Sequence, residues 1–296
     1  MDSVSSLNST IGVYEIGVLI SYVLLGVATT QTYIYYARFP DDSIKLKTLV
    51  AVVWLCEVAH AGCLGHALYS YTISDYTRPE RLLHAPISLG VAIAFAGIIT
   101  ACVQGFFTFR IYAFSEKLFI PVLLWTTIFL HLLGSIVILV TESRSTLLAD
   151  YEERWGWLFA AVWILSVAND VTITATLVIV LRRRRPYVLQ RTTALVDKII
   201  VWTIETGMLT SAVSIVTLTC FITMLGSFIF LATFSVTSRL FSNSLLASLN
   251  SRTTLRAMDE IPLPSLKLPD NLPSNGVQVS KVSELVFVVG SRSTVP

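Results

Sequence analysis

The chain has 296 residues, of which 54% are hydrophobic and only 14% are charged, and its mean hydropathy is +0.72. Water-soluble domains carry about a quarter of charged residues, so this composition excludes an ordinary soluble protein and predicts one that lies in a membrane. The formal net charge of +2 gives no support for nucleic-acid binding. All four cysteines lie inside apolar runs, which argues against the disulfide framework of a small secreted domain.

Seven apolar segments follow one another along the chain, each long enough for the roughly 20 residues that a helix needs to cross a bilayer. Because backbone groups in lipid must be satisfied within the segment, we predict helices. Only Leu225 and Gly226 separate the last two segments, so one bent element or a re-entrant pair is an alternative there. The predicted spans are Ile11 to Tyr36, Leu46 to Ile73, Ala85 to Phe114, Leu118 to Thr141, Trp155 to Leu181, Val196 to Met224 and Ser227 to Leu249.

Lysine and arginine are divided unevenly between the loops, and cytoplasmic loops carry the excess of both. With the N-terminus outside, the inner loops and the start of the tail hold thirteen basic residues and the outer loops hold four. The expected fold class is therefore an all-α, polytopic membrane protein with seven transmembrane helices, its N-terminus outside and its C-terminus cytoplasmic. We expect it in the plasma membrane, where Asn8 of the sequence Asn8-Ser9-Thr10 is a candidate for glycosylation.

These segments divide the chain into an extracellular N-terminus (1–10), a seven-helix transmembrane domain (11–250) and a cytoplasmic tail (251–296). The tail is rich in Ser, Pro, Asn and charged residues, which predicts disorder. A basic run follows the fifth span and consists of Arg182, Arg183, Arg184 and Arg185. Such a run fixes topology in the first instance, and it can also contact anionic lipid or a cytosolic partner.

Polar residues occur well inside five of the apolar segments. Each costs about 2 to 3 kcal/mol there unless it is neutralised, paired or solvated, so the residues are expected to face a shared interior rather than lipid. That interior is either a buried hydrogen-bond network or a water-filled cavity. The residues of this candidate intramembrane network are Glu57, His60, His131, Asn169, Asp170, Glu205 and Arg239.

Charge balance limits how this network can be arranged. Glu57 and His60 stand at i and i+3, on one helical face, where they can hydrogen-bond to each other. Arg239 is the one permanent cation near mid-depth, and its candidate counter-ions are Glu57, Asp170 and Glu205. One base cannot pair three acids tightly. At least one acid must then be protonated, paired with His60, or bound to an external cation.

Several roles remain open for these residues. Interhelical polar contacts commonly fasten membrane bundles together, and a ligand or ion pocket or a proton relay would use the same residue types. Cys56, His60 and Cys63 share one helical stripe, but a metal site would need further ligands from other spans, so we expect no metal and no other cofactor. No catalytic motif is present, and we expect no enzymatic activity.

Short motifs are spread along the apolar region. They comprise Gln31-Thr32-Tyr33-Ile34-Tyr35-Tyr36, Phe39-Pro40-Asp41, Trp54 with Glu57, His60 and His66, Tyr69-Ser70-Tyr71, Phe107 with Arg110-Ile111-Tyr112, Asp170, Glu205-Thr206-Gly207, and Ser242-Asn243-Ser244-Leu245-Leu246-Ala247-Ser248-Leu249-Asn250-Ser251-Arg252. In these motifs the chain from Ile11 to Arg252 resembles a large family of seven-span membrane proteins of basidiomycete fungi, catalogued as a domain of unknown function. The resemblance implies an architecture and no activity.

Two functional hypotheses follow. The first is a receptor-like seven-helix protein that senses a ligand or signals, lies in the lipid bilayer and contacts cytosolic partners through its inner loops and tail. The second is a transporter or proton-linked carrier that uses Glu57, His60, Asp170, Glu205 and Arg239.

Overall fold

The computed structural model of the chain describes residues 2–74, 84–115, 118–144, 148–184, 190–224 and 228–252. Side chains are described within these ranges except at residues 2–10, 148–152, 184 and 190–199. In this part of the chain every regular element is helical. The helices are α1 (Asp2–Arg38), α2 (Ile44–Tyr69), which continues into the π-helical turn η1 (Ser70–Ser74), α3 (Ile87–Ser115), α4 (Phe119–Glu142), α5 (Leu148–Arg184), α6 (Gln190–Thr223) and α7 (Ile229–Asn250).

The prediction of seven helices is confirmed, and α6 and α7 are two separate helices rather than one bent element. One difference lies at the start, where α1 extends back to Asp2, so most of the segment predicted to be a separate N-terminus continues the first helix. No proline or glycine interrupts the sequence before Gly12, which leaves nothing to end the helix. The predicted tail beyond residue 252 lies outside the described residues.

Six helices, α1 to α6, contain segments long and apolar enough to cross a membrane. The chain therefore has the character of a multi-pass membrane protein. α7 differs in composition, because it carries Arg239 together with several serine and threonine residues.

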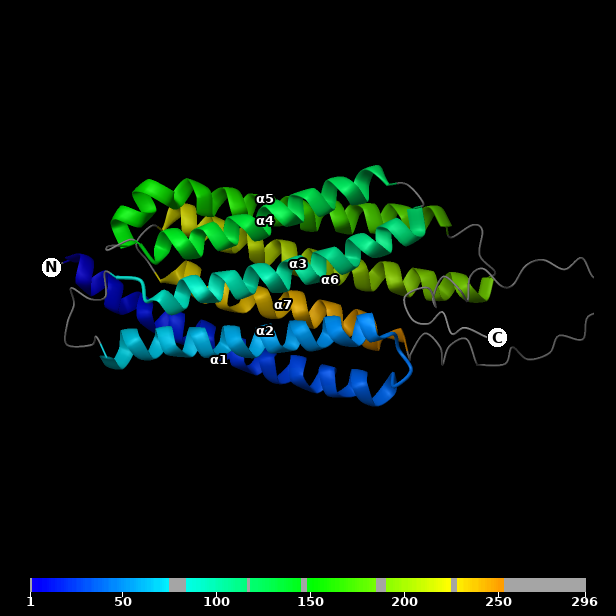
Figure 1. Ribbon diagram of the computed structural model, residues 1–296, viewed down its shortest axis with the longest axis horizontal. Helices are drawn as coiled ribbons and strands as arrows, with labels where there is room; N and C mark the ends of the chain where they lie inside the picture. The colour runs from blue at the N-terminus through cyan, green and yellow to red at the C-terminus, as the bar shows by residue number, and fades with distance from the viewer. Residues whose placement is uncertain are drawn as a thin grey trace, which may run out of the picture.

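The helices form an elongated bundle in which all seven run along the long axis (Figure 1). Successive helices alternate in direction, so the N-terminal end of the bundle carries the starts of α1, α3, α5 and α7, and the opposite end carries residues 39–43 and Arg252. Most described basic residues stand near this opposite end: Arg38, Lys45, Lys47, Arg110, Arg182, Arg183 and Arg252. Arg144 and Arg154 lie near the N-terminal end.

α7 lies in the centre of the bundle and contacts α1, α2, α3 and α6 (Figure 1). Thirteen of its 22 residues are buried, and they include Ser235, Ser238, Arg239 and Ser242. A peripheral helix such as α4 behaves differently, because it buries a single stripe with steps of three and four residues: Pro121, Leu124, Ile128, His131, Ser135 and Ile138. The polar composition of α7 is thus matched to an environment made by other helices rather than by lipid.

α1 and α7 approach each other closely at Gly17. A Cβ atom at this position would lie 2.5 Å from Cα of Ala232, so only glycine allows the two backbones to pack at this distance. Small residues at helix contacts are typical of membrane bundles, where close packing provides much of the association energy. This contact places Ser21, one turn further along α1, against the middle of α7.

Two apolar clusters stack along the α1, α2 and α7 side of the bundle. The cluster at the N-terminal end includes Tyr14, Leu64 and Phe234, and the cluster at the opposite end includes Tyr35, Val50 and Leu245. The side chains buried between the two clusters are, with the exception of Ala61, polar: Ser21 on α1, Glu57 and His60 on α2, and Ser235, Thr237, Ser238 and Arg239 on α7. The core therefore contains a polar layer closed above and below by apolar side chains.

Candidate functional site

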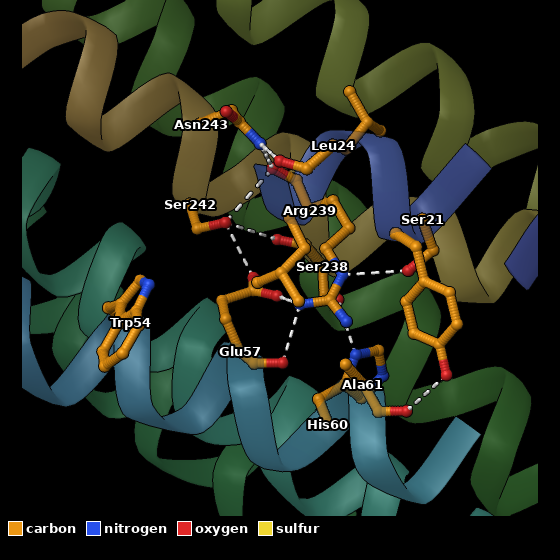
Figure 2. Close-up of polar contacts among 12 residues, drawn as sticks. Ser21, Leu24, Trp54, Glu57, His60, Ala61, Ser238, Arg239, Ser242 and Asn243 are labelled. Atoms are coloured by element: carbon orange, nitrogen blue, oxygen red, sulfur yellow. Dashed lines mark hydrogen bonds and ion pairs between the residues drawn. The ribbon is translucent and has the colours of Figure 1, made fainter. Parts of the chain in front are cut away.

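The polar layer between α1, α2 and α7 is an ion-pair cluster, a name used here for Ser21, Glu57, His60, Ser238, Arg239 and Ser242. Figure 2 shows that these side chains point toward one another from the three helices. Glu57, His60 and Arg239 have no exposed surface at all. A charge placed so deeply is tolerated only when a partner of opposite charge and further hydrogen bonds satisfy it.

Arg239 is the centre of this cluster. Its Nη1 forms an ion pair with Oε2 of Glu57 and donates a hydrogen bond of 2.8 Å to the backbone carbonyl of the same residue. Its Nε donates to Oγ of Ser21 at 2.9 Å. The second carboxylate oxygen of Glu57 accepts a hydrogen bond of 2.7 Å from Ser242 (Figure 2). One guanidinium thus ties α7 to both α1 and α2, and the pair as a whole is neutral.

His60 lies one turn from Glu57 but has a different partner. Its Nδ1 lies 3.2 Å from Oγ of Ser238 on α7, and its ring packs edge-on against Phe234 with the centroids 5.6 Å apart. Its Nε2 is buried and forms no hydrogen bond with any described residue. The expected hydrogen bond between Glu57 and His60 is not formed, because each side chain reaches α7 instead.

A second polar group joins α3, α4 and α5. In this amide cluster, made of Gln104, Thr127, Asn169 and Asp170, the Gln104 amide donates 2.7 Å to Oδ1 of Asp170 and accepts from Asn169 at 3.4 Å. Thr127 donates to the Asn169 side chain at 2.7 Å. Gln104, Asn169 and Asp170 are all buried. The contacts fix the carboxylate of Asp170 through neutral groups only.

Asp170 has one satisfied oxygen and one unsatisfied oxygen. Its Oδ2 is buried without a hydrogen-bond partner among the described residues. The residue lines a cavity between α3, α5, α6 and α7, the Asp170 cavity, which is bounded by Val103, Gln104, Phe107, Asp170, Ile173, Thr174, Leu177, Thr203, Thr206, Gly207, Thr210, Phe241 and Ser244. The cavity is large enough for water molecules, because the volume open to the centre of a water molecule is about 30 Å³.

A second cavity of similar size lies nearer the N-terminal end and is called the His131 cavity here. The polar residues of its wall are Thr100, His131, Ser135, Ser166, Thr237 and Ser238, and its apolar wall includes Trp163 and Phe234. Nδ1 of His131 is buried and unpartnered among the described residues. Ser238 borders this cavity and also contacts His60, and Phe241 borders both cavities. The ion-pair cluster and the two cavities are therefore neighbours inside the bundle, with Ser238 and Phe241 between them.

At the opposite end of the bundle, a contact called the latch here joins the α1–α2 loop to the end of α7. Arg252 forms an ion pair with Asp42, with both guanidinium nitrogens on the carboxylate, and its side chain stacks over Phe39 at 4.2 Å from the ring centroid. Tyr35 donates to the same carboxylate at 3.0 Å. The bidentate geometry and the aromatic neighbours make this a well-defined contact.

Residues 166–254 match a family described as a family of unknown function, DUF6534. Searches of the curated proteins and of the solved structures found no match to the chain. The matched stretch covers under a third of the chain and contains Asn169, Asp170, α6 and α7. It agrees with the expectation of a family without an assigned activity. The fungal source and the seven-span character of that family stay predictions.

The last motif of the sequence, from Ser242 to Arg252, lies within the matched stretch, and its polar residues make contacts along α7. Ser242 donates to Glu57, and Asn243 donates to the backbone carbonyl of Leu24 at 3.2 Å. Ser248 accepts from Arg110 at 2.9 Å, and Asn250 donates to the carbonyl of Gln31, also at 2.9 Å. Arg252 forms the latch. The polar residues of this motif thus attach α7 to α1, α2 and α3 along its length.

The predicted polar residues do not all converge. Glu57, His60 and Arg239 lie together, Asn169 and Asp170 form part of the amide cluster, and His131 faces its own cavity. Glu205 is exposed on the outside of α6, so its placement in a shared interior was wrong. The residues around Glu205 in the sequence are apolar and did not indicate which side of the helix it occupies. Among the described interactions, none joins Glu205 to the other six residues of the candidate network.

The remaining predicted residues are surface groups or lie outside the description. Arg182 and Arg183 are exposed near the opposite end of the bundle. The side chains of Arg184 and Asn8 and the whole of Arg185 lie outside the described residues. The cysteines are free, and no three described His, Cys, Asp or Glu side chains gather as a metal ion would require.

Sequence reasoning missed the neutral partners of the charged residues. Ser242 lies three residues after Arg239, so a helical wheel could have placed it on the same face. Ser238 lies four residues before Ser242 and could have been found from that spacing. Gln104 could have been found as an amide in the middle of the third span, by the same argument that singled out Asn169. Ser21 gave no such signal, because a lone serine is common on any membrane helix.

Proposed function

We propose that the chain is a seven-span receptor-like protein of the plasma membrane, with its N-terminus outside and its C-terminus in the cytoplasm. The seventh span is α7, whose polar side chains are covered by other helices. The orientation is supported by the described basic residues, most of which stand at the end opposite the N-terminus. Arg182 and Arg183 are exposed at that end, where anionic lipid or a cytosolic partner could contact them.

The observation that carries the receptor proposal is the His131 cavity. It lies in the half of the bundle nearer the N-terminal end, is lined by four helices, and combines aromatic walls with a few polar groups, the kind of lining that small-molecule sites have. Its present volume holds about two water molecules, so a larger ligand would bind only with a movement of the helices around it. In the proposed orientation this half faces outside. At the opposite end the latch between Asp42 and Arg252 ties the α1–α2 loop to the end of α7, which favours binding from one side over passage through the bundle.

α7 provides a route from the cavity to the cytoplasmic end. Phe234 and Ser238 border the cavity, Arg239 is held in the ion-pair cluster, and Arg252 at the end of the same helix holds the latch. A ligand that binds better to one position of α7 than to another would favour that position, and the difference in affinity sets how far the equilibrium between the two positions shifts. The latch would move with the helix. The inner loops and the tail would carry the change to a cytosolic partner.

Topology is tested by fusing a reporter to the C-terminus and by scoring glycosylation at Asn8. The proposal expects a cytoplasmic reporter signal and a glycosylated Asn8 that is lost in Asn8→Gln. A reporter signal from outside would overturn the proposed orientation.

Access to the cavity is tested by cysteine chemistry in a variant in which the four native cysteines are replaced by serine. Ser135→Cys places a thiol on the cavity wall, and Ile136→Cys places one on the outer surface of the same helix, where the native side chain is 45% exposed. A small, charged, membrane-impermeant thiol reagent should modify Ser135→Cys from outside only and should spare Ile136→Cys in lipid. Modification of Ser135→Cys from neither side would contradict ligand entry.

A transporter or proton-linked carrier is the second candidate, and Asp170 with its unpaired oxygen beside a cavity is the observation that favours it. Modification of Ser135→Cys from both sides of the membrane would support this candidate over a receptor. In reconstituted vesicles a pH-dependent flux that is abolished by Asp170→Asn would do the same.

A further inference from the structure

We infer that the Asp170 cavity binds a small monovalent metal cation, with sodium as the ion of matching size and charge. This inference goes beyond the receptor proposal and does not depend on it, because the cavity lies on the other side of Phe241 from the His131 cavity and needs no orientation in the membrane. It rests on charge, on the oxygen atoms of the cavity wall, and on space.

The charge at this site is not compensated by the described side chains. Asp170 is 6% exposed, and the neutral amide of Gln104 is the only side chain among the described residues that hydrogen-bonds to it. The described residues of the cavity wall include no lysine, arginine or histidine. Arg239, the permanent cation in the middle of the bundle, is committed to Glu57 on the other side of α7. An ionised carboxylate in such surroundings favours a bound cation, since an isolated buried charge is strongly unfavourable.

The wall of the cavity supplies further oxygen atoms in a suitable state. Thr206 donates its hydroxyl proton to the backbone carbonyl of Trp202 at 2.7 Å, and Thr210 donates to that of Gly207 at 3.2 Å. A hydroxyl whose proton is used in this way keeps its oxygen lone pairs for another partner. Thr174 and Ser244 add two more hydroxyl oxygens to the wall. Hard cations prefer such carboxylate and neutral oxygen ligands.

Valence and space narrow the choice of ligand. A divalent ion such as calcium is usually held by several carboxylates, whereas one carboxylate with neutral oxygens balances a single positive charge. An anion would meet Asp170 without any base to offset it. The volume open to the centre of a water molecule is about 30 Å³. This space is enough for a metal ion with a water molecule and too small for a larger organic cation.

The inference is tested with the purified full-length protein in detergent by measuring thermal unfolding in sodium chloride and in choline chloride at equal ionic strength. A ligand that binds the folded state raises the unfolding midpoint. Going from sodium-free buffer to about 150 mM sodium should raise the midpoint by roughly 3 °C or more, while choline should leave it unchanged. Equal shifts with both salts would overturn the inference.

Three variants locate the effect. Asp170→Asn should remove the sodium-dependent shift, and Thr206→Val, which keeps the shape of the side chain but removes one oxygen, should move the sodium response to concentrations several-fold higher. Glu205→Gln is the matched control, because this acid is exposed and lies one residue away from the cavity-lining Thr206. A sodium shift that survives in Asp170→Asn, or that is lost in Glu205→Gln, would contradict binding at Asp170.

Discussion

The bundle buries two acids in its middle and treats them in opposite ways. Glu57 has no exposed surface and is held by an arginine, a serine and the neighbouring helices. Asp170 is almost as deeply buried and lines a cavity, but one of its oxygens contacts an amide and the other has no hydrogen-bond partner among the described residues. In the first arrangement the two charges balance each other without a ligand, although Nη2 of Arg239 has no hydrogen-bond partner among the described residues. In the second the charge of the acid has no counter-charge among the described side chains, so structure is expected to dominate at Glu57 and binding at Asp170.

The difference follows from the position of α7. This helix carries the one arginine in the middle of the bundle, and its side chain is directed to α1 and α2, where Glu57 lies. Asp170 lies on α5, which meets α3, α4 and α6. A single guanidinium cannot serve both sides of α7, so the acid on the far side is left with neutral partners.

Removing the cation of the ion-pair cluster should have the largest effect. Arg239→Met leaves Glu57 as an uncompensated buried charge, which is expected to lower the free energy of unfolding by about 3 to 5 kcal/mol. Thermal unfolding of the purified protein measures this loss. Arg183→Met is the control, because Arg183 is exposed at the end of α5, and it should leave the midpoint unchanged.

A double variant separates the lost pair from lost packing. Glu57→Gln with Arg239→Met removes both charges, and its stability should be higher than that of Arg239→Met alone, because no unpaired charge remains. If the double variant were instead as unstable as the sum of the two single changes, the ion pair would not be the interaction that couples α2 to α7.

Enlarging Gly17 should have the next largest effect, since the close approach of α1 and α7 holds Ser21 against Arg239. Gly17→Leu would force the helices apart and cost about 1 to 3 kcal/mol or more. Gly26→Leu is the control, because it lies on the same helix with open space around it. Similar unfolding midpoints for the two variants would show that the close contact is not required.

Opening the latch should have a smaller effect. Asp42→Asn removes the charge that Arg252 contacts but keeps a hydrogen-bond acceptor, and about 1 kcal/mol is expected for a partly buried pair. Asp41→Asn changes the neighbouring exposed acid and serves as its control. Limited proteolysis of the opposite end of the bundle should be faster in Asp42→Asn than in Asp41→Asn; equal rates would show that the latch does not hold this end closed.

The helices were predictable from the sequence because lipid solvation demands long apolar segments, and seven were found. Four have bounds within a few residues of the prediction, whereas α1, α5 and α6 begin six to nine residues earlier than predicted. The candidate site was predictable only in part. A charged residue is easy to identify within an apolar span, and Glu57, Asp170 and Arg239 were found in this way. Their grouping depends on helix rotation, and α6 is apolar on so many sides that the exposure of Glu205 could not be inferred.

The neutral partners were harder to predict for a different reason. Serine and glutamine carry no charge, so their burial does not require a specific partner that the sequence could reveal. The contacts of Ser238, Ser242 and Gln104 with the charged residues and His60 became apparent only when the helices were placed side by side. The same holds for Gly17, whose importance comes from Ala232, 215 positions away along the chain.

The comparison between the two acids is tested most directly by two matched amide substitutions, Glu57→Gln and Asp170→Asn, measured side by side by thermal unfolding in sodium-free buffer. Glu57→Gln leaves Arg239 buried without a counter-charge and should lower the midpoint by several degrees, as a loss of about 3 kcal/mol would. Asp170→Asn keeps an oxygen for the Gln104 amide and removes an unpaired charge, so the midpoint should be unchanged or higher. A large loss of stability in Asp170→Asn together with a neutral Glu57→Gln would contradict the account.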